Sequence, residues 1–245
     1  KGGTNWSWPE PPDLISYDQI GLDCGQPTAL LAQLRQWDEC LLLTPPDMCA
    51  PLRSLCLAKL GRPMEAINTM AKNLTGKPGD SAAWQLSYPL LYGRVIASEG
   101  ALKKVDPLLA QALTREESRY NPEAVSVSNA RGLMQLLPPT AYGVAKRLGV
   151  GLSGMRDMHK PEINLKLGID YLAYTLARHK GNAMLAVASY NGGPNAVARF
   201  AKSYSLADQD VFVEQIPYTE TRDYVRKVFS SYWNYQSVYA KKPSL

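Results

Sequence analysis

The stretch Thr114-Arg-Glu-Glu-Ser-Arg-Tyr-Asn-Pro122 places two adjacent carboxylates at the end of an apolar segment. The preceding apolar residues recur at the spacing of one helix face: Val105, Leu108, Leu109, Ala112 and Leu113. We therefore predict a helix over residues 101–120, which ends before Pro122. Either Glu116 or Glu117 continues the apolar face, so spacing alone does not choose between them. A partly buried carboxyl group has a raised pKa and can act as an acid, whereas the alternative is an exposed pair that binds neighbouring arginines.

Three later stretches place single polar side chains among apolar or small residues. In Gly132-Leu-Met-Gln-Leu136, the amide of Gln135 follows a loop of small, polar residues that can approach a ligand closely. In Ser189-Tyr-Asn-Gly-Gly-Pro194, a Tyr-Asn pair at a helix end presents its polar tips to a cleft. These glycines lack the spacing of a phosphate-binding loop. Glu220 lies in the first turn of the last predicted helix, where a purely capping role is the alternative.

The remaining pattern predicts helices and no strands. Further helices are expected over residues 138–148, from Pro161, from Asn182 to Asn191, over 195–202 and over 220–239. Residues 149–161 and 208–218 are expected to be loops. No segment alternates apolar and polar residues as a strand does, so the predicted fold is all-α.

Residues 1–100 have a different organisation. Residues 1–13 are rich in Gly and Pro and predict an extended arm, and residues 28–75 predict three or four short antiparallel helices that stack like a solenoid. Lys77-Pro-Gly-Asp80 predicts a linker. The predicted domains are therefore a helical N-terminal region, residues 1–80, and a second domain, residues 81–245. The aromatic stretch 84–93 is either a strap that docks on the second domain or an irregular bridge.

The charge of the chain is unevenly distributed. The net charge is +5; residues 1–100 hold 8 basic and 10 acidic residues, whereas residues 101–245 hold 19 basic and 12 acidic ones. This balance favours an anionic partner such as a wall polymer, a nucleic acid or a membrane surface, against the alternative of an ordinary soluble surface. No dense basic run or stacking motif supports nucleic-acid binding.

The sequence also bears on membrane insertion and export. No apolar run approaches the ~20 residues that a transmembrane helix needs, so no transmembrane segment is predicted. The first residue is Lys1 rather than Met. We therefore expect a processed product or a recombinantly expressed fragment, from which any targeting segment has been lost.

The four cysteines, Cys24, Cys40, Cys49 and Cys56, all lie in the first quarter of the chain. An even, clustered set favours disulfides in an oxidising compartment, with buried free thiols as the alternative. A helix over residues 47–60 would hold Cys49 and Cys56 about 10 Å apart along its axis, beyond the ~7 Å limit for a bridge. Cys24 and Cys40 are then their partners, in an order that the sequence leaves open. A zinc site is not favoured, because no CxxC spacing occurs and both histidines lie far away in the sequence.

Four stretches in this order resemble those of the soluble lytic murein transglycosylases: Glu117-Ser-Arg-Tyr-Asn-Pro122, Gly132-Leu-Met-Gln-Leu136, Ser189-Tyr-Asn-Gly-Gly-Pro194 and Ile216-Pro-Tyr-Thr-Glu-Thr-Arg-Asp-Tyr-Val225. The resemblance covers about residues 100–235 and implies a catalytic domain with a goose-type-lysozyme-like fold. Residues 84–100 resemble the segment that precedes this domain in the large members, whose helical superhelix suits residues 28–75. The cysteines depart from the family pattern, and so does Leu137, where a Met is often found.

The resemblance implies that the chain is an enzyme acting on peptidoglycan glycan strands. The Glu that directly precedes Ser118 becomes the single catalytic acid/base, Glu117. Substrate-binding roles carry over to Ser126, Met134, Gln135, Tyr190, Asn191 and Glu220. The implied reaction cleaves the β1,4 bond between MurNAc and GlcNAc with help from the substrate's N-acetyl group and leaves 1,6-anhydro-MurNAc ends, with no water consumed and no metal or other cofactor.

Two alternatives remain open. One is a hydrolytic muramidase on the same scaffold, and the other is a non-catalytic peptidoglycan-binding protein. In each case the implied location is the periplasm or cell envelope. The sequence identifies no partner in the cell-wall machinery.

Overall fold

The structure is a computed structural model that describes residue 24, residues 27–45, 49–74, 76, 82–202 and 209–240. Across these residues the chain forms helices and no β-strand, and two isolated bridge pairs join Val125 to Arg131 and Arg131 to Leu136. The predicted all-α fold is therefore confirmed. The predicted arm, residues 1–13, and the predicted linker, residues 77–80, lie outside the described residues.

The chain divides into two compact units. Unit 1 consists of Lys1–Leu91 and Asn234–Leu245, and unit 2 consists of Tyr92–Trp233. The last helix, α14 (Thr219–Tyr239), begins in unit 2, and its final residues belong to unit 1. Each unit has buried apolar residues of its own.

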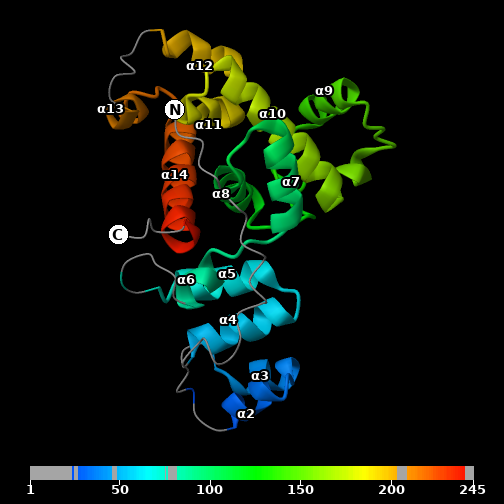
Figure 1. The fold of residues 1–245 in the computed structure, drawn as a ribbon, viewed down its shortest axis with the longest axis vertical. Coiled ribbons are helices and arrows are strands. Elements are labelled where there is room, and N and C mark those ends of the chain that lie inside the picture. The colour runs from blue at the N-terminus through cyan, green and yellow to red at the C-terminus, as the bar shows by residue number, and fades with distance from the viewer. Residues whose placement is uncertain are drawn as a thin grey trace. The chain divides into compact units, whose positions relative to one another are not determined.

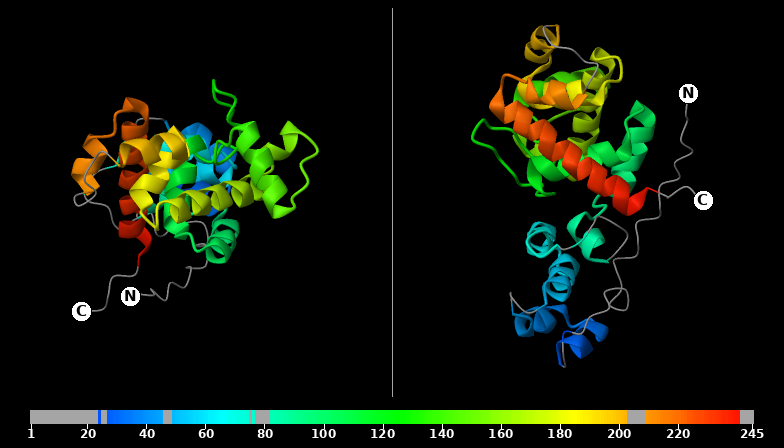
Figure 2. Two further views of the ribbon diagram at one scale, coloured as in Figure 1. Left: turned by 90° about the horizontal axis from the view of Figure 1, so that it is seen from above. Right: turned by 90° about the vertical axis from the view of Figure 1, so that its left-hand side faces the viewer.

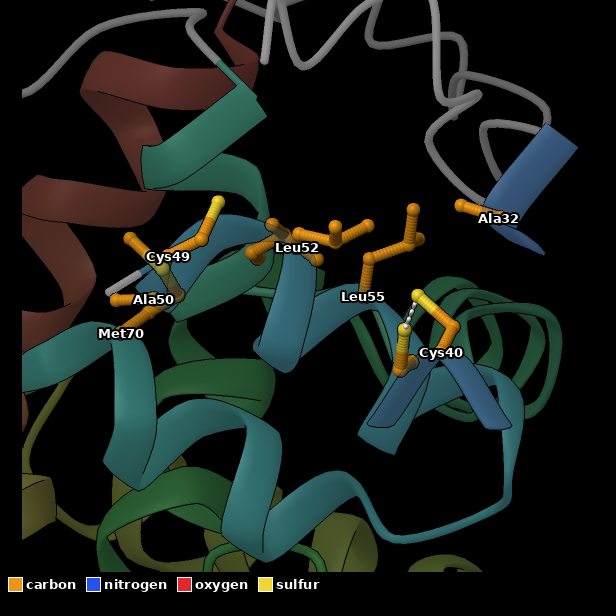
Figure 3. Close-up of a cluster of buried hydrophobic side chains, with 9 residues drawn as sticks. Ala32, Cys40, Cys49, Ala50, Leu52, Leu55 and Met70 are labelled. Carbon is orange, nitrogen blue, oxygen red and sulfur yellow. Dashed lines mark hydrogen bonds between the residues drawn. The ribbon is translucent and has the colours of Figure 1, made fainter. Parts of the chain in front are cut away.

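Unit 1 is built from short helices in which each packs against the next one along the chain (Figure 1). They are α2 (Thr28–Gln33), α3 (Trp37–Leu43), α4 (Ala50–Lys59), α5 (Pro63–Ala71) and α6 (Ala82–Ser87). Pro51 and Pro63 lie in the first turns of α4 and α5, where a missing amide hydrogen has no cost. Leu52, Leu55 and Met70 belong to their common buried cluster (Figure 3). Four short helices over residues 28–75 agree with the predicted solenoid-like pattern.

The aromatic stretch that begins in α6 packs against the end of α14 within unit 1. The ring of Tyr88 stacks on Trp84 and meets Tyr235 edge-on. The hydroxyl of Tyr239 donates a hydrogen bond of 2.8 Å to the main-chain oxygen of Tyr88. Part of this stretch is helical, as α6, rather than irregular.

In unit 2, α8 (Pro107–Ser118) lies among further helices (Figure 1). These are α7 (Gly93–Lys103), α9 (Pro138–Leu148), α10 (Pro161–Arg178), α11 (Ala183–Gly192), α12 (Pro194–Phe200), α13 (Gln209–Glu214) and the first part of α14, with a 3₁₀ turn, η1, at Met155–His159. Figure 2 shows that α14, drawn in orange to red, runs along one side of this unit.

The single helix predicted over residues 101–120 is wrong. Two helices occupy that region, because Asp106 caps a new one: its carboxylate accepts a hydrogen bond of 2.8 Å from the amide of Leu108. Pro107 then takes the first helical position. The loop predictions are also wrong in part, because residues 149–161 contain η1 and residues 208–218 contain α13.

The end of α8 is fixed by an unusual backbone conformation. Arg119 and Tyr120 both adopt left-handed φ values, of 49° and 63°, which cost energy for residues other than Gly. Tyr120 is only 1% exposed, and its hydroxyl donates a hydrogen bond of 3.1 Å to the main-chain oxygen of Gln111. Burial of this ring offsets the cost and holds the Glu117 end of α8 in one conformation.

The side chain of Asn164 on α10 fixes the loop Gly132–Leu136. Asn164 is 1% exposed. Its oxygen accepts from the amide of Met134 at 2.7 Å, and its nitrogen donates to the main-chain oxygens of Arg131 and Met158 at 3.0 and 2.8 Å. Gly132 has φ 76°, and a Cβ there would collide with the Asn164 amide. Only Gly therefore allows this close approach.

We predict that Asn164→Ala lowers the free energy of unfolding by about 3 kcal/mol, because it leaves three buried main-chain groups without their partner. Denaturant unfolding followed by circular dichroism measures this loss. The matched control is Asn195→Ala, which removes an exposed side chain bonded to Arg178 and should cost less than about 1 kcal/mol. Equal costs for both variants would contradict the role given to Asn164.

Candidate active site

Glu117 lies in the last turn of α8, partly buried against α14. The hydroxyl of Tyr224, on α14, donates a hydrogen bond of 2.6 Å to Oε1 of Glu117. Burial raises the pKa of Glu117 to about 8; the hydrogen bond from Tyr224 opposes this rise, and the charge of Glu116 adds to it. The group is therefore largely protonated near neutral pH, as a general acid must be.

The neighbouring Glu116 has different surroundings. Its Oε1 accepts hydrogen bonds from Nη1 of Arg115 at 2.8 Å and from Oγ of Ser231 at 2.5 Å. Arg115 is itself buried, and the hydrogen bond from Ser231 joins Glu116 on α8 to α14. Glu116 thus pairs with the buried guanidinium group of Arg115, whereas Glu117 has the hydroxyl group of Tyr224 as its polar partner.

Two hydrogen bonds bring the Gly132–Leu136 loop to the end of α8 and to α11. Oγ of Ser118 donates to the main-chain oxygen of Leu133 at 2.8 Å. The hydroxyl of Tyr190, on α11, donates to the main-chain oxygen of Met134 at 2.9 Å. The pKa values of Tyr190 and Tyr224 are raised by burial and then by the charge of Glu117, so the three side chains lie close together.

Gln135 has a strained backbone, with φ 44°, and a tethered side chain. Its Nε2 donates to the main-chain oxygens of Ala124 and Gly132 at 3.1 and 2.9 Å. Both amide hydrogens are thereby used within the protein. The side-chain oxygen of Gln135 is the atom left to accept a hydrogen bond from a ligand.

Asn191 and Glu220 lie where α11 meets the start of α14. Oγ1 of Thr221 donates to Oδ1 of Asn191 at 2.7 Å. A Cβ at Gly192 would come within 2.8 Å of the same hydroxyl, so Gly keeps the two helix ends in contact. Glu220 is exposed in the first turn of α14.

Ser126 lies in the loop that precedes Gly132. It is exposed, and its Oγ accepts from the amide of Ala130 at 3.0 Å. Within the described part of the chain, no hydrogen bond joins Ser126 or Glu220 to Glu117. The structure thus gathers Glu117, Met134 and Tyr190 closely, with Gln135 on the same loop and Asn191 on the same helix as Tyr190.

Tyr224 is the main residue of this site to which the sequence analysis gave no role. It belongs to the fourth stretch, four residues after Glu220, and lies four residues before the buried Val228 on one helix face. That spacing placed Tyr224 on the inner face of α14. Its partner, 107 residues earlier in the sequence, could be found only from the folded chain.

The described residues contain no group of His, Cys, Asp and Glu side chains that could hold a metal ion. Across the same residues, no helix is both long and apolar enough to span a membrane.

Comparisons with known proteins agree with this architecture. Residues 94–212 match the family model of the transglycosylase SLT domain. The soluble lytic murein transglycosylase of Escherichia coli K12 is 34% identical over 160 residues, which are 64% of this chain and 25% of that protein. The chain therefore spans about a quarter of the length of this curated relative.

Two solved structures share the fold. The lytic transglycosylase Slt of Pseudomonas aeruginosa, an inactive mutant in which Gln replaces a Glu, superposes with a TM-score of 0.70 and 26% identity, covering 87% of this chain and 34% of that one. The 70-kDa soluble lytic transglycosylase of Escherichia coli gives a TM-score of 0.71 at 24% identity, covering 94% of this chain and 39% of that one.

Residues 94–212 thus resemble the transglycosylase SLT domain, and the chain shares the helical fold of the solved lytic transglycosylases. The resemblance of the chain to the soluble lytic murein transglycosylases is confirmed.

We predict that Tyr224→Phe raises the pKa of Glu117 above its value of about 8, because it removes the hydrogen bond that favours the carboxylate. A ¹³C NMR titration of the Glu side-chain carboxyl groups measures this value. The control is Tyr174→Phe on α10, an exposed tyrosine, which should leave the titration of Glu117 unchanged. An unchanged or lower pKa in Tyr224→Phe would refute the assigned interaction.

The raised pKa also predicts how stability depends on pH. Between the ordinary pKa of 4.5 and about 8, the folded protein keeps a proton on Glu117 that the unfolded chain has lost. The stability that the protonated carboxyl group of Glu117 gives the folded state is therefore fully present below pH 4.5. It is lost as the pH rises from 4.5 to about 8. Glu117→Gln, a neutral mimic of the protonated acid, should gain stability over the parent chain across this range.

Urea unfolding at several pH values measures that difference. Glu39→Gln is the control, because Glu39 is exposed; it should show no such dependence. A difference between Glu117→Gln and the parent chain that stays constant with pH would contradict the burial of an ionisable Glu117.

Proposed function

We propose that this chain carries a peptidoglycan lytic transglycosylase in which Glu117 is the single catalytic acid/base. The observation that carries the proposal is the partly buried Glu117, with its pKa of about 8 and a tyrosine hydroxyl as its partner. Support comes from the match to the transglycosylase SLT domain and from the relatives named soluble lytic murein transglycosylases. An inactive Glu-to-Gln mutant of the Pseudomonas aeruginosa enzyme is in keeping with a catalytic Glu.

The proposed reaction begins with protonated Glu117. The acid donates its proton to the oxygen of the β1,4 bond between MurNAc and GlcNAc, and the C1–O bond breaks. The acetamido oxygen of the substrate supports C1 and does the work of a second carboxylate. Glu117, now charged, takes the proton of the C6 hydroxyl, whose oxygen attacks C1. The proton returns to Glu117 and the product is a 1,6-anhydro sugar, so no water is consumed.

The surroundings of Glu117 suit a mechanism with one carboxylate. Most glycosidases use two carboxyl groups about 5 to 9.5 Å apart. The adjacent Glu116 is held by Arg115 and Ser231 and is turned into the protein. It is thereby a packing residue of α8 and not a second catalytic group.

Substrate binding is proposed for the residues around the acid. Gln135 retains a side-chain oxygen that can accept a hydrogen bond from the acetamido N–H. Tyr190 donates to Met134, so its hydroxyl oxygen remains an acceptor for the same sugar, and Met134 positions the loop. The proposed groove extends beyond these residues to three exposed side chains. They are Asn191 on α11, Ser126 in the loop before Gly132, and Glu220 on α14.

The proposed location is the periplasm or cell envelope, where peptidoglycan is found. The disulfide Cys24–Cys49 supports it, because such bonds persist in oxidising compartments. The basic excess of residues 101–245 suits an acidic wall polymer.

We predict that Glu117→Gln lowers the release of muropeptides from purified peptidoglycan by at least about 10²-fold, the contribution of acid/base catalysis, while sedimentation with insoluble wall material persists. Glu116→Gln is the matched variant: it should retain most of the turnover and instead lower the unfolding temperature, because a buried ion pair is broken. An active Glu117→Gln beside a folded but inactive Glu116→Gln would reverse the assignment.

Mass spectrometry of the same digest separates this reaction from its alternative. Transglycosylation gives anhydro ends, whereas a hydrolytic muramidase gives reducing ends that are heavier by one water. Digestion in H₂¹⁸O should leave the products unlabelled. Products carrying ¹⁸O at the new ends would establish hydrolysis, and no products at all from the parent chain would favour a wall-binding protein.

A further inference from the structure

Two cysteines of unit 1 lie in contact without a bond between them. Cys40 is in α3 and Cys56 is in α4; each is 0% exposed, and their sulfur atoms are 3.0 Å apart. Figure 3 shows the sulfur of Cys40 joined by a dashed line to this second sulfur. The separation exceeds an S–S bond of ~2.05 Å by about 1 Å.

We propose that Cys40 and Cys56 are joined by a second disulfide in the oxidised protein. The bond forms between the two Sγ atoms. Each thiol loses one hydrogen, and the two electrons and two protons pass to a disulfide oxidant, which is reduced to two thiols. The product links α3 to α4 over a sequence separation of 16 residues.

The helices around the two thiols are held in place independently of the bond. Nη1 of Arg53, on α4, donates to the main-chain oxygens of Leu41 and Thr44 at 3.3 and 2.7 Å. Oγ1 of Thr44 donates to the main-chain oxygen of Cys40 at 2.6 Å. These contacts fix the end of α3 on α4, so closure of the bond needs little change in the backbone.

The Cys24–Cys49 bridge is compatible with a second bond between Cys40 and Cys56. Cys24 is bonded to Cys49, with the two Cα atoms 5.9 Å apart. This confirms the prediction that Cys49 does not pair with Cys56, and it leaves Cys40 and Cys56 as each other's remaining partners. The first bond joins Cys24, which precedes α2, to the start of α4, and the second would join α3 to α4.

Burial sets the order of events. The oxidant cannot reach thiols that are fully covered, and burial together with Cys40 raises the pKa of the Cys56 thiol, which lowers its reactivity in the folded state. The bond therefore forms before α3 closes over α4. Once formed, it is shielded from reductants to a greater extent than Cys24–Cys49, because Cys24 is partly exposed.

Peptide mapping tests the connectivity directly. The reduced chain is refolded with glutathione disulfide, its free thiols are alkylated, and it is digested with trypsin and a protease that cleaves before Asp. Each cysteine then falls on its own peptide: residues 23–35, 38–46, 47–53 and 54–59. The proposal predicts that peptide 54–59 is joined to 38–46, with a mass two hydrogens below the sum, and that 23–35 is joined to 47–53.

The result that overturns the proposal is peptide 54–59 recovered in any other form, whether alkylated, bound to glutathione or joined to another peptide. A matched variant keeps the test independent of the Cys24–Cys49 bridge. In Cys24→Ala/Cys49→Ala, peptides 38–46 and 54–59 should still be joined. In the parent chain, brief treatment with dithiothreitol without denaturant should open Cys24–Cys49 first; prior opening of Cys40–Cys56 would contradict the shielding.

Discussion

The hydrogen bond from Tyr224 to Glu117 joins the end of α8 to α14 and gives a buried carboxyl group its polar partner. A charged carboxylate in this position would lose its hydration, so burial favours the protonated form. The tyrosine limits this effect because its hydroxyl stabilises the charged form. An acid/base must exist in both forms during one reaction cycle, and the balance between burial and this hydrogen bond supplies that property.

The rest of unit 2 keeps this carboxyl group in place. The Arg115–Glu116–Ser231 contacts hold the same two helices together one residue away. The left-handed residues Arg119 and Tyr120 stop α8 directly after the acid, and Asn164 fixes the loop that carries Gln135. Strain in the backbone and a buried polar side chain thus occur where the site is built, as is common in functional sites.

Local sequence patterns predicted most helices and the stretches that form the site. Pro138, Pro161 and Gly193-Pro194 mark helix starts because Pro suits the first turn, and Asn182 caps α11 as predicted. The division of residues 101–120 was missed, because its apolar periodicity outweighed the Asp106-Pro107 start signal. The difference between Glu116 and Glu117 was hidden for another reason: it depends on Ser231 and Tyr224, more than 100 residues away. Cysteine pairing was likewise beyond local patterns, since it requires the packing of α3 on α4.

The central claim is that the protonated form of Glu117 carries the reaction, and the pH dependence of kcat/KM on soluble glycan fragments tests it most directly. This parameter reports the pKa of the free enzyme's acid. The account predicts that kcat/KM falls as the pH rises through about 8, and that this descending limb moves to higher pH in Tyr224→Phe together with the NMR pKa of Glu117. A descending limb that stays in place while the pKa of Glu117 moves would contradict it.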